Sequence, residues 1–400
     1  MARNSSGTAD QTPVGIIGAG PAGLMLSHLL HLQGIDSIVL ELRSREYVEK
    51  RVRAGVLEQG SVDLLNATGV GDRMKRQGLV HEGIKLRFSG EEHRIDFRKL
   101  AGRSITVYGQ QEVVKDLIAR RLSDGGDIRF EAQAVAVGDI SGQPTIRYRQ
   151  AGDHRELRCR VVAGCDGSHR VAASSMLDDS FQVYERQWPF GWLGILARTP
   201  PATDELIYAH HERGFALHSM RTPEISRLYL QVPADETMDH WPADRIWDEL
   251  RIRLNEPKLK PGEILEQGIT PMRSVVTEPM QRGNLFLAGD AAHIVPPTGA
   301  KGMNLALNDV NILAEGLVEY FRSGARDKLD TYSERCLRRV WRAEHFSAWM
   351  TGLLHRDPAG DPFEYKLRLS YLRYVTTSTA AATTLAENYV GFDPGPTPLG

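Results

Sequence analysis

A glycine-rich turn near the N-terminus constrains the fold of this chain more than any other feature. Gly18, Gly20 and Gly23 lie at GxGxxG spacing, after the apolar residues 14–17 and before leucines at helical spacing. Such glycines permit a tight turn, a close approach of phosphate to the backbone and close packing of helix on strand. The N-terminus of the following helix attracts an anion. This context predicts a βαβ unit that binds a dinucleotide.

The residues after this turn complete the unit. Residues 21–33 predict a helix that ends at Gly34, and residues 37–40 predict the next strand. Glu41 follows that strand, where a carboxylate accepts hydrogen bonds from ribose hydroxyls. Residues 57–67 and 111–122 predict further helices, and residues 161–163 predict a buried strand before Gly164-Cys165-Asp166-Gly167.

A Gly-Asp pair far along the chain indicates which dinucleotide is bound. Gly289 and Asp290 follow the apolar residues 285–288, and a loop with two prolines and two glycines precedes a helix expected from Asn304. An aspartate in this place can be only a helix cap. A helix start also suits the electron-rich edge of a reduced isoalloxazine. We therefore expect Asp290 on the ribityl chain of FAD, in a flavin enzyme rather than a simple nicotinamide dehydrogenase.

The expected fold class is α/β, with a Rossmann-like FAD-binding domain, an inserted and mostly antiparallel β-sheet for the substrate, and a C-terminal helical region. Residues 1–180 are assigned to the first part of the FAD-binding domain, with residues 1–13 as a disordered lead-in. The substrate sheet is expected at 181–272, where four short strand-like runs occur at 190–197, 206–210, 215–219 and 227–232. Residues 273–400 are assigned to a second FAD-binding segment and a helical interface region, with helical stretches at 329–354 and 369–389.

The composition favours a cytoplasmic protein without nucleic-acid or membrane partners. The formal net charge is −2, and no apolar run approaches the roughly 20 residues of a membrane span. The N-terminus lacks a hydrophobic signal region. The three cysteines, Cys159, Cys165 and Cys336, lack metal-ligand spacing, and their scarcity suits a reducing compartment. His293 has no second ligand at a suitable spacing, so no metal site is expected.

Three motifs resemble the fingerprints of the group A flavoprotein aromatic hydroxylases: the glycine turn, the Cys165-Asp166-Gly167 segment and the Gly289-Asp290 pair. Residues 53–60, 78–83, 190–194, 289–302 and 386–391 are similar to family members that act on 4-hydroxybenzoate, so the resemblance spans about residues 14–391. It implies that NADH or NADPH reduces FAD, and that O2 and reduced flavin form a C4a-hydroperoxide. One oxygen atom then goes to carbon 3 of 4-hydroxybenzoate, giving 3,4-dihydroxybenzoate in aromatic catabolism. A homodimer is also implied.

The resemblance assigns residues to each ligand. Those implied to contact the flavin are Gly18, Gly20, Ala22, Gly23, Glu41, Arg51, Arg53, Gln110, Asp166, Asp290, Gly299, Met303 and Asn304. Those implied to contact the nicotinamide donor are Tyr47, Arg51, Arg53, His169 and Arg273. The substrate residues are Tyr208, Ser219, Arg221, Tyr229 and Pro297, and the catalytic set is Tyr208, Tyr389, His81, Pro297, Lys301 and Asn304.

The chemistry of a phenol gives these residue types a purpose. Hydroxylation needs a phenolate, because the ionised oxygen donates electron density to the ring carbon ortho to it. A free phenol titrates near pH 10, so the site must remove a proton; Tyr208, Tyr389 and His81 match a relay to solvent. Arg221 suits a benzoate carboxylate because its fork binds two oxygens. Ser219 lies two residues away, on the same face of a strand.

Two other functions remain open at this point. The chain can act on a neighbouring benzoate, such as 4-aminobenzoate, 3-hydroxybenzoate or 3,4-dihydroxybenzoate, because the volume of the pocket is not visible in the sequence. It can also be a non-catalytic flavin or NAD sensor, although a proton relay has no purpose there. A colourless purified protein would favour the sensor.

We predict that NADH is used at least as well as NADPH. Leu42 stands directly after Glu41, where NADPH-specific relatives carry an arginine that binds the 2′-phosphate, and Ala173 matches a second such arginine. Each lost charged contact weakens binding by roughly 1.5–3 kcal/mol, although Arg43 and Arg45 lie close by. Steady-state kinetics with both donors test this: a kcat/KM for NADPH more than about tenfold above that for NADH contradicts it. Leu42→Arg is expected to shift preference toward NADPH.

Overall fold

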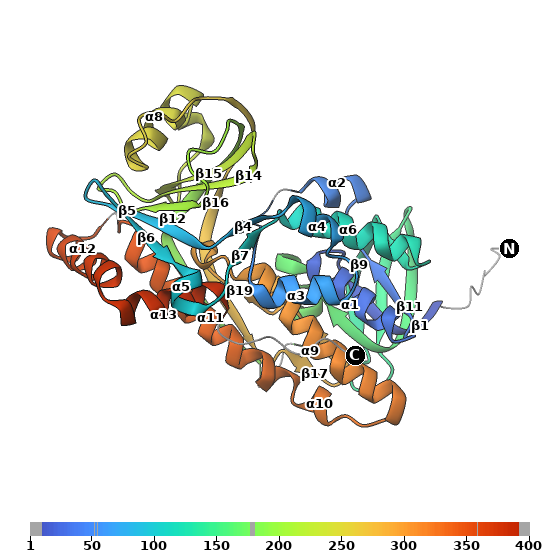
Figure 1. The fold of residues 1–400 in the computed structure, drawn as a ribbon. Helices are drawn as coiled ribbons and strands as arrows, with labels where there is room; N and C mark the ends of the chain where they lie inside the picture. The colour runs from blue at the N-terminus through green and yellow to red at the C-terminus, as the bar shows by residue number, and fades with distance from the viewer. Residues whose placement is uncertain (1–9, 52, 54, 177–180, 358, 392–400) are drawn as a thin grey trace.

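The computed structural model describes residues 10–51, 53, 55–176, 181–357 and 359–391, arranged around two large β-sheets (Figure 1). The first sheet lies on the side of the N-terminus with α1 and α6, and the second lies beside α8 and α12. The long helices α9 (Gly302–Ser323) and α11 (Tyr332–Leu354) run beneath both in this view. They connect the two halves of the molecule.

The first sheet has the strand order β17-β18-β11-β1-β2-β8, and β10 and β9 extend it beyond β11. Its strands are β1 (Asp10–Ile17), β2 (Ser37–Leu40), β8 (Asp127–Arg129), β9 (Ala132–Gly138), β10 (Thr145–Gln150), β11 (Asp153–Gly164), β17 (Gln281–Arg282) and β18 (Leu285–Leu287). β1 pairs in parallel with both β11 and β2. Parallel strands are covered on both faces, which explains why all four residues of β2 are buried.

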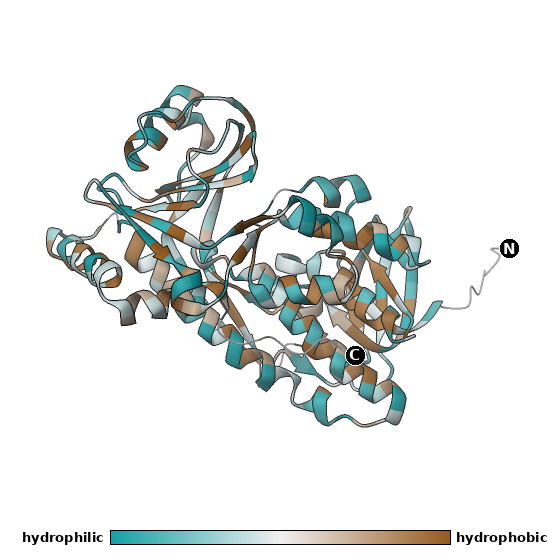
Figure 2. Cartoon of the chain, viewed as in Figure 1, coloured by the Kyte–Doolittle hydropathy of each residue, from teal (hydrophilic) through white to brown (hydrophobic). Residues whose placement is uncertain are grey.

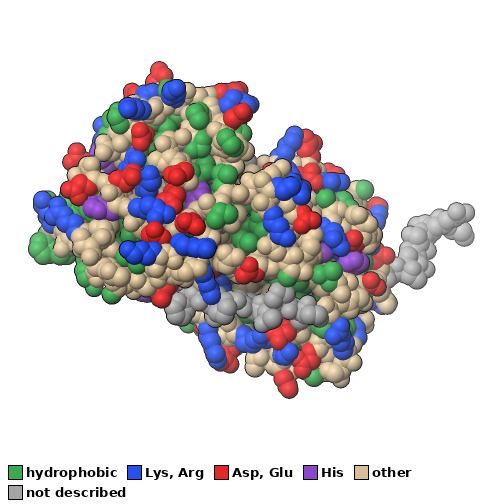
Figure 3. Space-filling view, in the orientation of Figure 1, with side chains coloured by type: hydrophobic (Ala, Val, Ile, Leu, Met, Phe, Trp, Pro, Cys, Tyr) green, Lys and Arg blue, Asp and Glu red, His purple; other side chains and the backbone are tan. Residues whose placement is uncertain are grey.

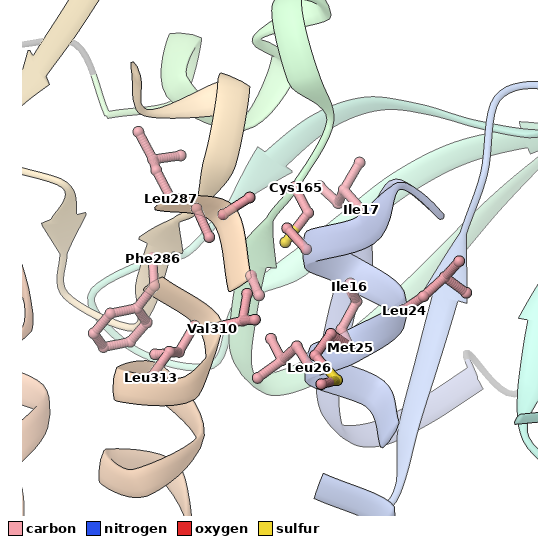
Figure 4. Packing of buried hydrophobic residues seen from close by; sticks show 14 of the residues in the cluster. Ile16, Ile17, Leu24, Met25, Leu26, Cys165, Phe286, Leu287, Val310 and Leu313 are labelled. Carbon is pink, nitrogen blue, oxygen red and sulfur yellow. The ribbon is translucent and has the colours of Figure 1, made fainter. Parts of the chain in front are cut away.

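Helices α1 (Pro21–Leu32), α6 (Gln110–Ser123) and α9 pack together beside this sheet. In Figure 2 its strands are largely hydrophobic, whereas α2 (Arg45–Lys50) and α4 (Asp72–Gln77) at the surface are mostly hydrophilic. Figure 4 shows Leu24 of α1, Phe286 of β18 and Leu313 of α9 among the buried side chains of the core, and none of the three is exposed. This core fixes the glycine turn relative to the start of α9.

The second sheet has the order β19-β16-β12-β15-β14-β13-β5-β6. Its strands are β5 (Gly83–Phe88), β6 (Glu91–Asp96), β12 (Gln182–Arg198), β13 (Leu206–Ala209), β14 (Ala216–Thr222), β15 (Ile225–Pro233), β16 (Glu263–Glu278) and β19 (His293–Ile294). All neighbours are antiparallel except β13 and β5. The sheet therefore extends beyond residues 181–272, because β5, β6 and β19 join it from other parts of the chain and β16 continues to Glu278.

A small third sheet joins β3 (Val56–Leu57), β7 (Ile105–Val107) and β4 (Leu79–His81). The remaining helices are α3 (Gln59–Ala67), α5 (Phe97–Ala101), α7 (Val171–Ser174), α8 (Ala243–Arg253), α10 (Asp327–Asp330), α12 (Pro362–Thr377) and α13 (Thr379–Val390). The α/β fold class expected from the sequence is confirmed, with a dinucleotide-type parallel sheet, a mostly antiparallel second sheet and helices toward the C-terminus.

Several expected boundaries are wrong. Residues 10–13 belong to β1, because Asp10 to Thr12 pair with β11, while residues 1–9 of the expected lead-in lie outside the described part of the chain. Leu57 is in a strand, not a helix, because it pairs with Thr106. The stretch 369–389 is two helices, since Ser378 caps the second by accepting a hydrogen bond from Ala381 N.

Charged side chains of both signs are interspersed over the face in Figure 3. Within the described ranges, no helix is both long enough and apolar enough to cross a membrane.

Candidate functional site

A cavity of about 1130 Å³ is lined by segments from distant parts of the chain. Ten of the residues expected from the sequence line it: Tyr47, Arg51, Arg53, Gln110, Tyr229, Arg273, Asp290, Pro297, Lys301 and Met303. They come from α2 and the loop after it, α6, β15, β16 and the segment that leads into α9. The fold therefore brings expected flavin and nicotinamide residues to one space with two of the expected substrate residues, Tyr229 and Pro297. The other substrate residues, Tyr208, Ser219 and Arg221, are not among the residues that line the cavity.

The glycine turn has the geometry that the sequence predicted. A Cβ added to Gly23 would lie 2.0 Å from the carbonyl oxygen of Gly18, and Gly18 itself has a φ of +104°. These two glycines are required by the close packing of α1 on β1. At Gly20, which precedes α1, an added Cβ meets no atom within 4 Å. The N-terminus of α1 therefore faces open space, as an anion site requires.

Glu41 holds the end of β2 against this turn. Its carboxylate accepts hydrogen bonds from Ala19 N and Arg43 N, both at 2.8 Å. Arg43 also stacks over the Tyr47 ring at 5.2 Å. Ala173, the position matched to a second 2′-phosphate arginine, is 2% exposed within α7. An alanine there supplies no cation for a 2′-phosphate.

The loop that carries Asp290 is anchored from below by Asp309 of α9. Asp309 Oδ2 accepts a hydrogen bond from Gly289 N at 3.0 Å and lies 2.6 Å from His293 Nε2. Burial alone would lower the pKa of His293, but the attraction of Asp309 raises it above its usual value. This buried ion pair engages His293 and leaves Asp290 exposed at the cavity wall.

Lys301 forms a second buried ion pair, with Glu58. Its Nζ donates to Glu58 Oε1 at 2.6 Å and to the carbonyl oxygen of Tyr389 at 2.9 Å, while Arg339 donates to Glu58 Oε2 at 2.7 Å. Burial raises the pKa of Glu58, but attraction to Lys301 and Arg339 outweighs burial and lowers it. Asn304 does not line the cavity; it bonds Glu58 N at 2.9 Å and the Val56 carbonyl at 3.0 Å.

Tyr208 and Tyr389 form the direct hydrogen-bonded pair that a proton relay needs. Their hydroxyl oxygens are 2.6 Å apart, and Tyr208 Oη also donates to the Thr298 carbonyl at 3.3 Å. Each side chain is 1% exposed. Burial raises the pKa of both phenols, so both carry their protons at neutral pH.

His81 is buried, but no direct hydrogen bond joins it to Tyr389 within the described residues. Both of its ring nitrogens lack a hydrogen-bond partner. Burial lowers the pKa of His81 to about 4, so the ring is neutral at pH 7.

Two arginines lie beside Tyr229 with hydrogen-bonding capacity to spare. Arg221 Nη1 donates to Ser219 Oγ at 3.1 Å and to the Met220 carbonyl at 3.0 Å, while its Nε is buried without a partner. Arg227, two residues before Tyr229 on β15, has its Nε and Nη1 buried without hydrogen bonds, although Nη1 forms an ion pair with Glu266 Oε1 at 3.6 Å. Buried donors in native proteins normally have partners, and a carboxylate supplies two acceptor oxygens.

Of the other glycine, histidine and proline positions singled out in the sequence, Gly299 and His169 lie outside the cavity wall, whereas Gly302 and Pro297 line it. Gly299 packs against α11, where an added Cβ would lie 2.6 Å from Ser347 Oγ, whereas one on Gly302 would meet no atom within 4 Å. His169 is exposed and does not line the cavity. The Pro297 carbonyl accepts a hydrogen bond from Ala300 N at 3.0 Å, which leaves one lone pair for a further donor.

Comparison with known proteins identifies the family. A family model described as an FAD binding domain matches residues 11–347. The chain is 49% identical over 385 residues to the p-hydroxybenzoate hydroxylase of Acinetobacter baylyi, covering 95% of each protein. The chain belongs to the group A flavoprotein hydroxylases. It is accordingly an FAD-dependent monooxygenase that takes an aromatic substrate, O2 and NAD(P)H.

More distant members share this fold. A 3-(3-hydroxy-phenyl)propionate/3-hydroxycinnamic acid hydroxylase of Mycobacterium sp. (strain JLS) is 25% identical over 331 residues, which cover 80% of this chain and 56% of that protein. The structure of p-nitrophenol 4-monooxygenase from Pseudomonas putida DLL-E4 superposes with a TM-score of 0.82 at 18% identity, covering 96% of this chain and 100% of that one.

The residues present fit the flavin of this family. Gly20 opens onto free space at the start of α1, where a pyrophosphate needs backbone N–H groups without a side chain above them. Asp166 Oδ2 accepts a hydrogen bond from Ala172 N at 3.2 Å, while Oδ1 is buried without a partner. Asp290 and Met303 face the same cavity at the start of α9. These groups would hold the pyrophosphate, ribityl chain and ring.

Sequence reasoning missed three residues of the site. Trp192 and Arg227 line the cavity, and Glu58 binds Lys301 from behind it. Arg227 was recognisable because it lies two residues before Tyr229, on the same face of a strand. Glu58 carries no local signal, since its partners lie 243 and 281 residues away.

Proposed function

We propose that this enzyme hydroxylates 4-hydroxybenzoate at carbon 3 to give 3,4-dihydroxybenzoate. The observation that carries the proposal is the hydrogen-bonded pair Tyr208–Tyr389, with hydroxyl oxygens 2.6 Å apart, in a chain that also holds Arg221 and Ser219 beside the cavity residue Tyr229. A phenol relay and a carboxylate anchor match the two ends of a 4-hydroxybenzoate molecule. The 49% identity to a p-hydroxybenzoate hydroxylase supports the same substrate.

At the carboxylate end, Arg221 and Ser219 orient the substrate. The Nε of Arg221 has no protein partner, and the Ser219 hydroxyl lies 3.1 Å from Nη1 of the same guanidinium. Burial lowers the pKa of Arg221, but an arginine remains charged at neutral pH. An anionic ligand therefore satisfies both the charge and the open donor.

At the phenol end, the tyrosines move the proton. A substrate hydroxyl that is hydrogen bonded to Tyr208 transfers its proton to Tyr208, which transfers its own proton to Tyr389. Because each tyrosine accepts one proton as it donates another, neither accumulates as a tyrosinate. The Lys301 ammonium lies 5.6 Å from the centre of the Tyr389 ring. Its positive potential favours the phenolate form of the substrate. We propose that the buried His81, whose two ring nitrogens have no hydrogen-bond partner, accepts the proton from Tyr389 on its way to solvent.

Bound FAD, reduced by NAD(P)H, supplies the electrons that activate O2. The Rossmann-like sheet, the glycine turn and Asp290 would hold it, and the rings of Trp192 and Tyr229, with centroids 4.8 Å apart, form an aromatic part of the cavity wall. We further propose that Arg51, Arg53, Tyr47 and Arg273, which line the cavity, receive the nicotinamide donor.

Arg221→Lys tests the function and its anchor together. The wild-type holoenzyme is expected to oxidise NAD(P)H faster with 4-hydroxybenzoate than with 4-aminobenzoate, 3-hydroxybenzoate or 3,4-dihydroxybenzoate, and to release 3,4-dihydroxybenzoate. The lysine variant is expected to keep FAD but lose substrate affinity, because truncating a buried charge pair costs on the order of 2–5 kcal/mol. No stimulation of the wild type by 4-hydroxybenzoate contradicts the function. A dissociation constant within about threefold of wild type in Arg221→Lys contradicts the anchor.

Tyr208→Phe and Tyr389→Phe test the relay. Phenylalanine keeps the ring and removes the hydroxyl, so substrate binding is expected to change less than hydroxylation, and NAD(P)H oxidation is expected to produce peroxide instead. Coupling is measured as 3,4-dihydroxybenzoate formed per NAD(P)H consumed. Tyr184→Phe, an exposed tyrosine away from the cavity wall, is the control. Wild-type rate and coupling in both relay variants would rule the relay out.

We also propose that the enzyme is a homodimer that pairs through α12. Phe363, Leu367, Tyr371 and Tyr374 recur at helical spacing on this helix and are 70%, 49%, 44% and 52% exposed. In Figure 3, hydrophobic side chains gather at the edge of the molecule where Figure 1 places α12. Large exposed apolar stripes on soluble proteins mark interaction surfaces, and a self-complementary helix face suits a two-fold dimer.

Leu367→Glu combined with Tyr371→Glu tests this interface. Like charges facing each other across the two-fold axis are expected to convert the dimer to the 44.6 kDa monomer in sedimentation velocity. Ile252→Glu on α8, which is 42% exposed in the wild type, is the matched control and should stay dimeric. A monomeric wild type contradicts the dimer, and a dimeric double variant contradicts this surface.

A cytoplasmic location is part of the same proposal. The three cysteines Cys159, Cys165 and Cys336 are buried and unpaired, which suits a reducing compartment.

A further inference from the structure

Three consecutive residues at the C-terminal end of α11 form hydrogen bonds with residues in, or directly after, three different strands of the second sheet. The Leu354 carbonyl accepts from His210 Nδ1 at 2.9 Å, directly after β13. His355 Nε2 accepts from Trp192 Nε1 of β12 at 2.6 Å. Arg356 N donates to Gln231 Oε1 of β15 at 3.0 Å. Of His210, Trp192 and Gln231, Trp192 is the one that lines the cavity.

The His355 ring is held in one orientation and one tautomer. Its Nδ1 donates to the Thr351 carbonyl at 3.0 Å, which leaves Nε2 as the acceptor for the indole N–H. The ring stacks on Phe190 with centroids 4.8 Å apart and planes within 5°, and it is 1% exposed. Burial lowers the pKa of His355 to about 3, so Nε2 remains an acceptor across the pH range of an enzyme assay.

Trp192 connects His355 to the residues around the proposed substrate site. Its ring lies 4.8 Å from Tyr229, which stands beside the Arg221 anchor, and 5.4 Å from Phe215. Phe215 in turn lies 6.1 Å from Tyr208 at the phenol end. Movement of the indole therefore changes the wall between the two ends of the proposed substrate.

The same turn of α11 also reaches the phenol end. The Thr351 and Thr298 hydroxyl oxygens are hydrogen bonded at 2.9 Å, and the Thr298 carbonyl accepts from Tyr208 Oη at 3.3 Å. Thr351 and His355 thus hold two walls of the substrate region from one helix end. His355, which does not line the cavity, can therefore control the distance between these two walls.

We propose that His355 is a positioning residue that sets substrate specificity: by fixing the indole of Trp192 it keeps the cavity narrow enough to prefer a single aromatic ring without a bulky substituent beside the hydroxyl. This inference rests on the proposed function. His355 acts through Trp192 and takes no part in proton transfer, since its ring nitrogens are both engaged.

The test measures dissociation constants of oxidised holoenzyme for 4-hydroxybenzoate and for the bulkier 4-hydroxy-3-methoxybenzoate. His355→Leu leaves the buried indole N–H without a partner and frees the ring to move. We expect binding of 4-hydroxybenzoate to weaken about tenfold and binding of the methoxy compound to change less than threefold, so that selectivity falls. His355→Asn, too short to span both partners, should do the same. His355→Gln, which keeps an acceptor and a donor, should remain within threefold of wild type.

A double-variant cycle separates positioning from general damage to the fold. Trp192→Phe removes the indole donor, so adding His355→Leu to it should change the 4-hydroxybenzoate constant by less than twofold. His210→Gln is the matched control: a buried histidine bonded to the same helix end without contact to a cavity-lining indole. It should lower the melting temperature but leave selectivity unchanged.

The outcomes separate this inference from the proposed function. A wild-type enzyme that fails to bind 4-hydroxybenzoate contradicts the function. A wild type that binds it, with unchanged selectivity in both His355→Leu and His355→Asn, overturns the positioning role alone. A full tenfold loss on adding His355→Leu to Trp192→Phe also overturns it, as does an equal loss of selectivity in His210→Gln.

Discussion

The carboxylate of Glu58, buried between Lys301 and Arg339, is the interaction on which the centre of this molecule depends. It joins the loop before α3, the loop before α9 and the middle of α11, three segments that are far apart in the sequence. Lys301 also donates to the carbonyl of Tyr389, so the C-terminal helix α13 is held by the same pair. Removing one partner of a buried ion pair typically costs about 3–5 kcal/mol, so each segment depends on the others.

The long helices α9 and α11 extend from this ion pair to the two sheets. The N-terminus of α9 faces the cavity, and Asp309 farther along it anchors the Gly289–Asp290 loop. α11 contacts α9 along its course and ends at the second sheet, where His355 receives the indole of Trp192. The residues proposed to bind the flavin on one sheet and the substrate on the other are thereby held in fixed positions relative to one another. This rigidity explains how residues from distant segments form one cavity.

Local sequence signals predicted the parts of the site that depend on backbone geometry. Gly18 and Gly23 were recognisable because only glycine fits where an added Cβ would lie within 2.3 Å of a carbonyl oxygen. The strands around Arg221 and Tyr229 followed from alternation and turn residues. The same reasoning failed at Leu57, which pairs with Thr106 in a sheet, because a two-residue strand has no periodicity of its own. It also confined the second sheet to one stretch of chain, although β5 and β6 complete its edge.

By itself, the sequence determined the α/β class, the dinucleotide turn and the identity of the chemical groups available for an aromatic acid, because each is a short-range property of residue type and spacing. Only the tertiary structure decided which of those groups meet. The 2.6 Å contact of Tyr208 with Tyr389 spans 181 residues, and the bond of Trp192 to His355 spans 163. No local pattern encodes such contacts, since they arise from the packing of helices and sheets that lie far apart in the sequence. The same packing left His81 without a direct bond to Tyr389 and placed Asn304 behind the cavity wall, where its amide holds Val56 and Glu58.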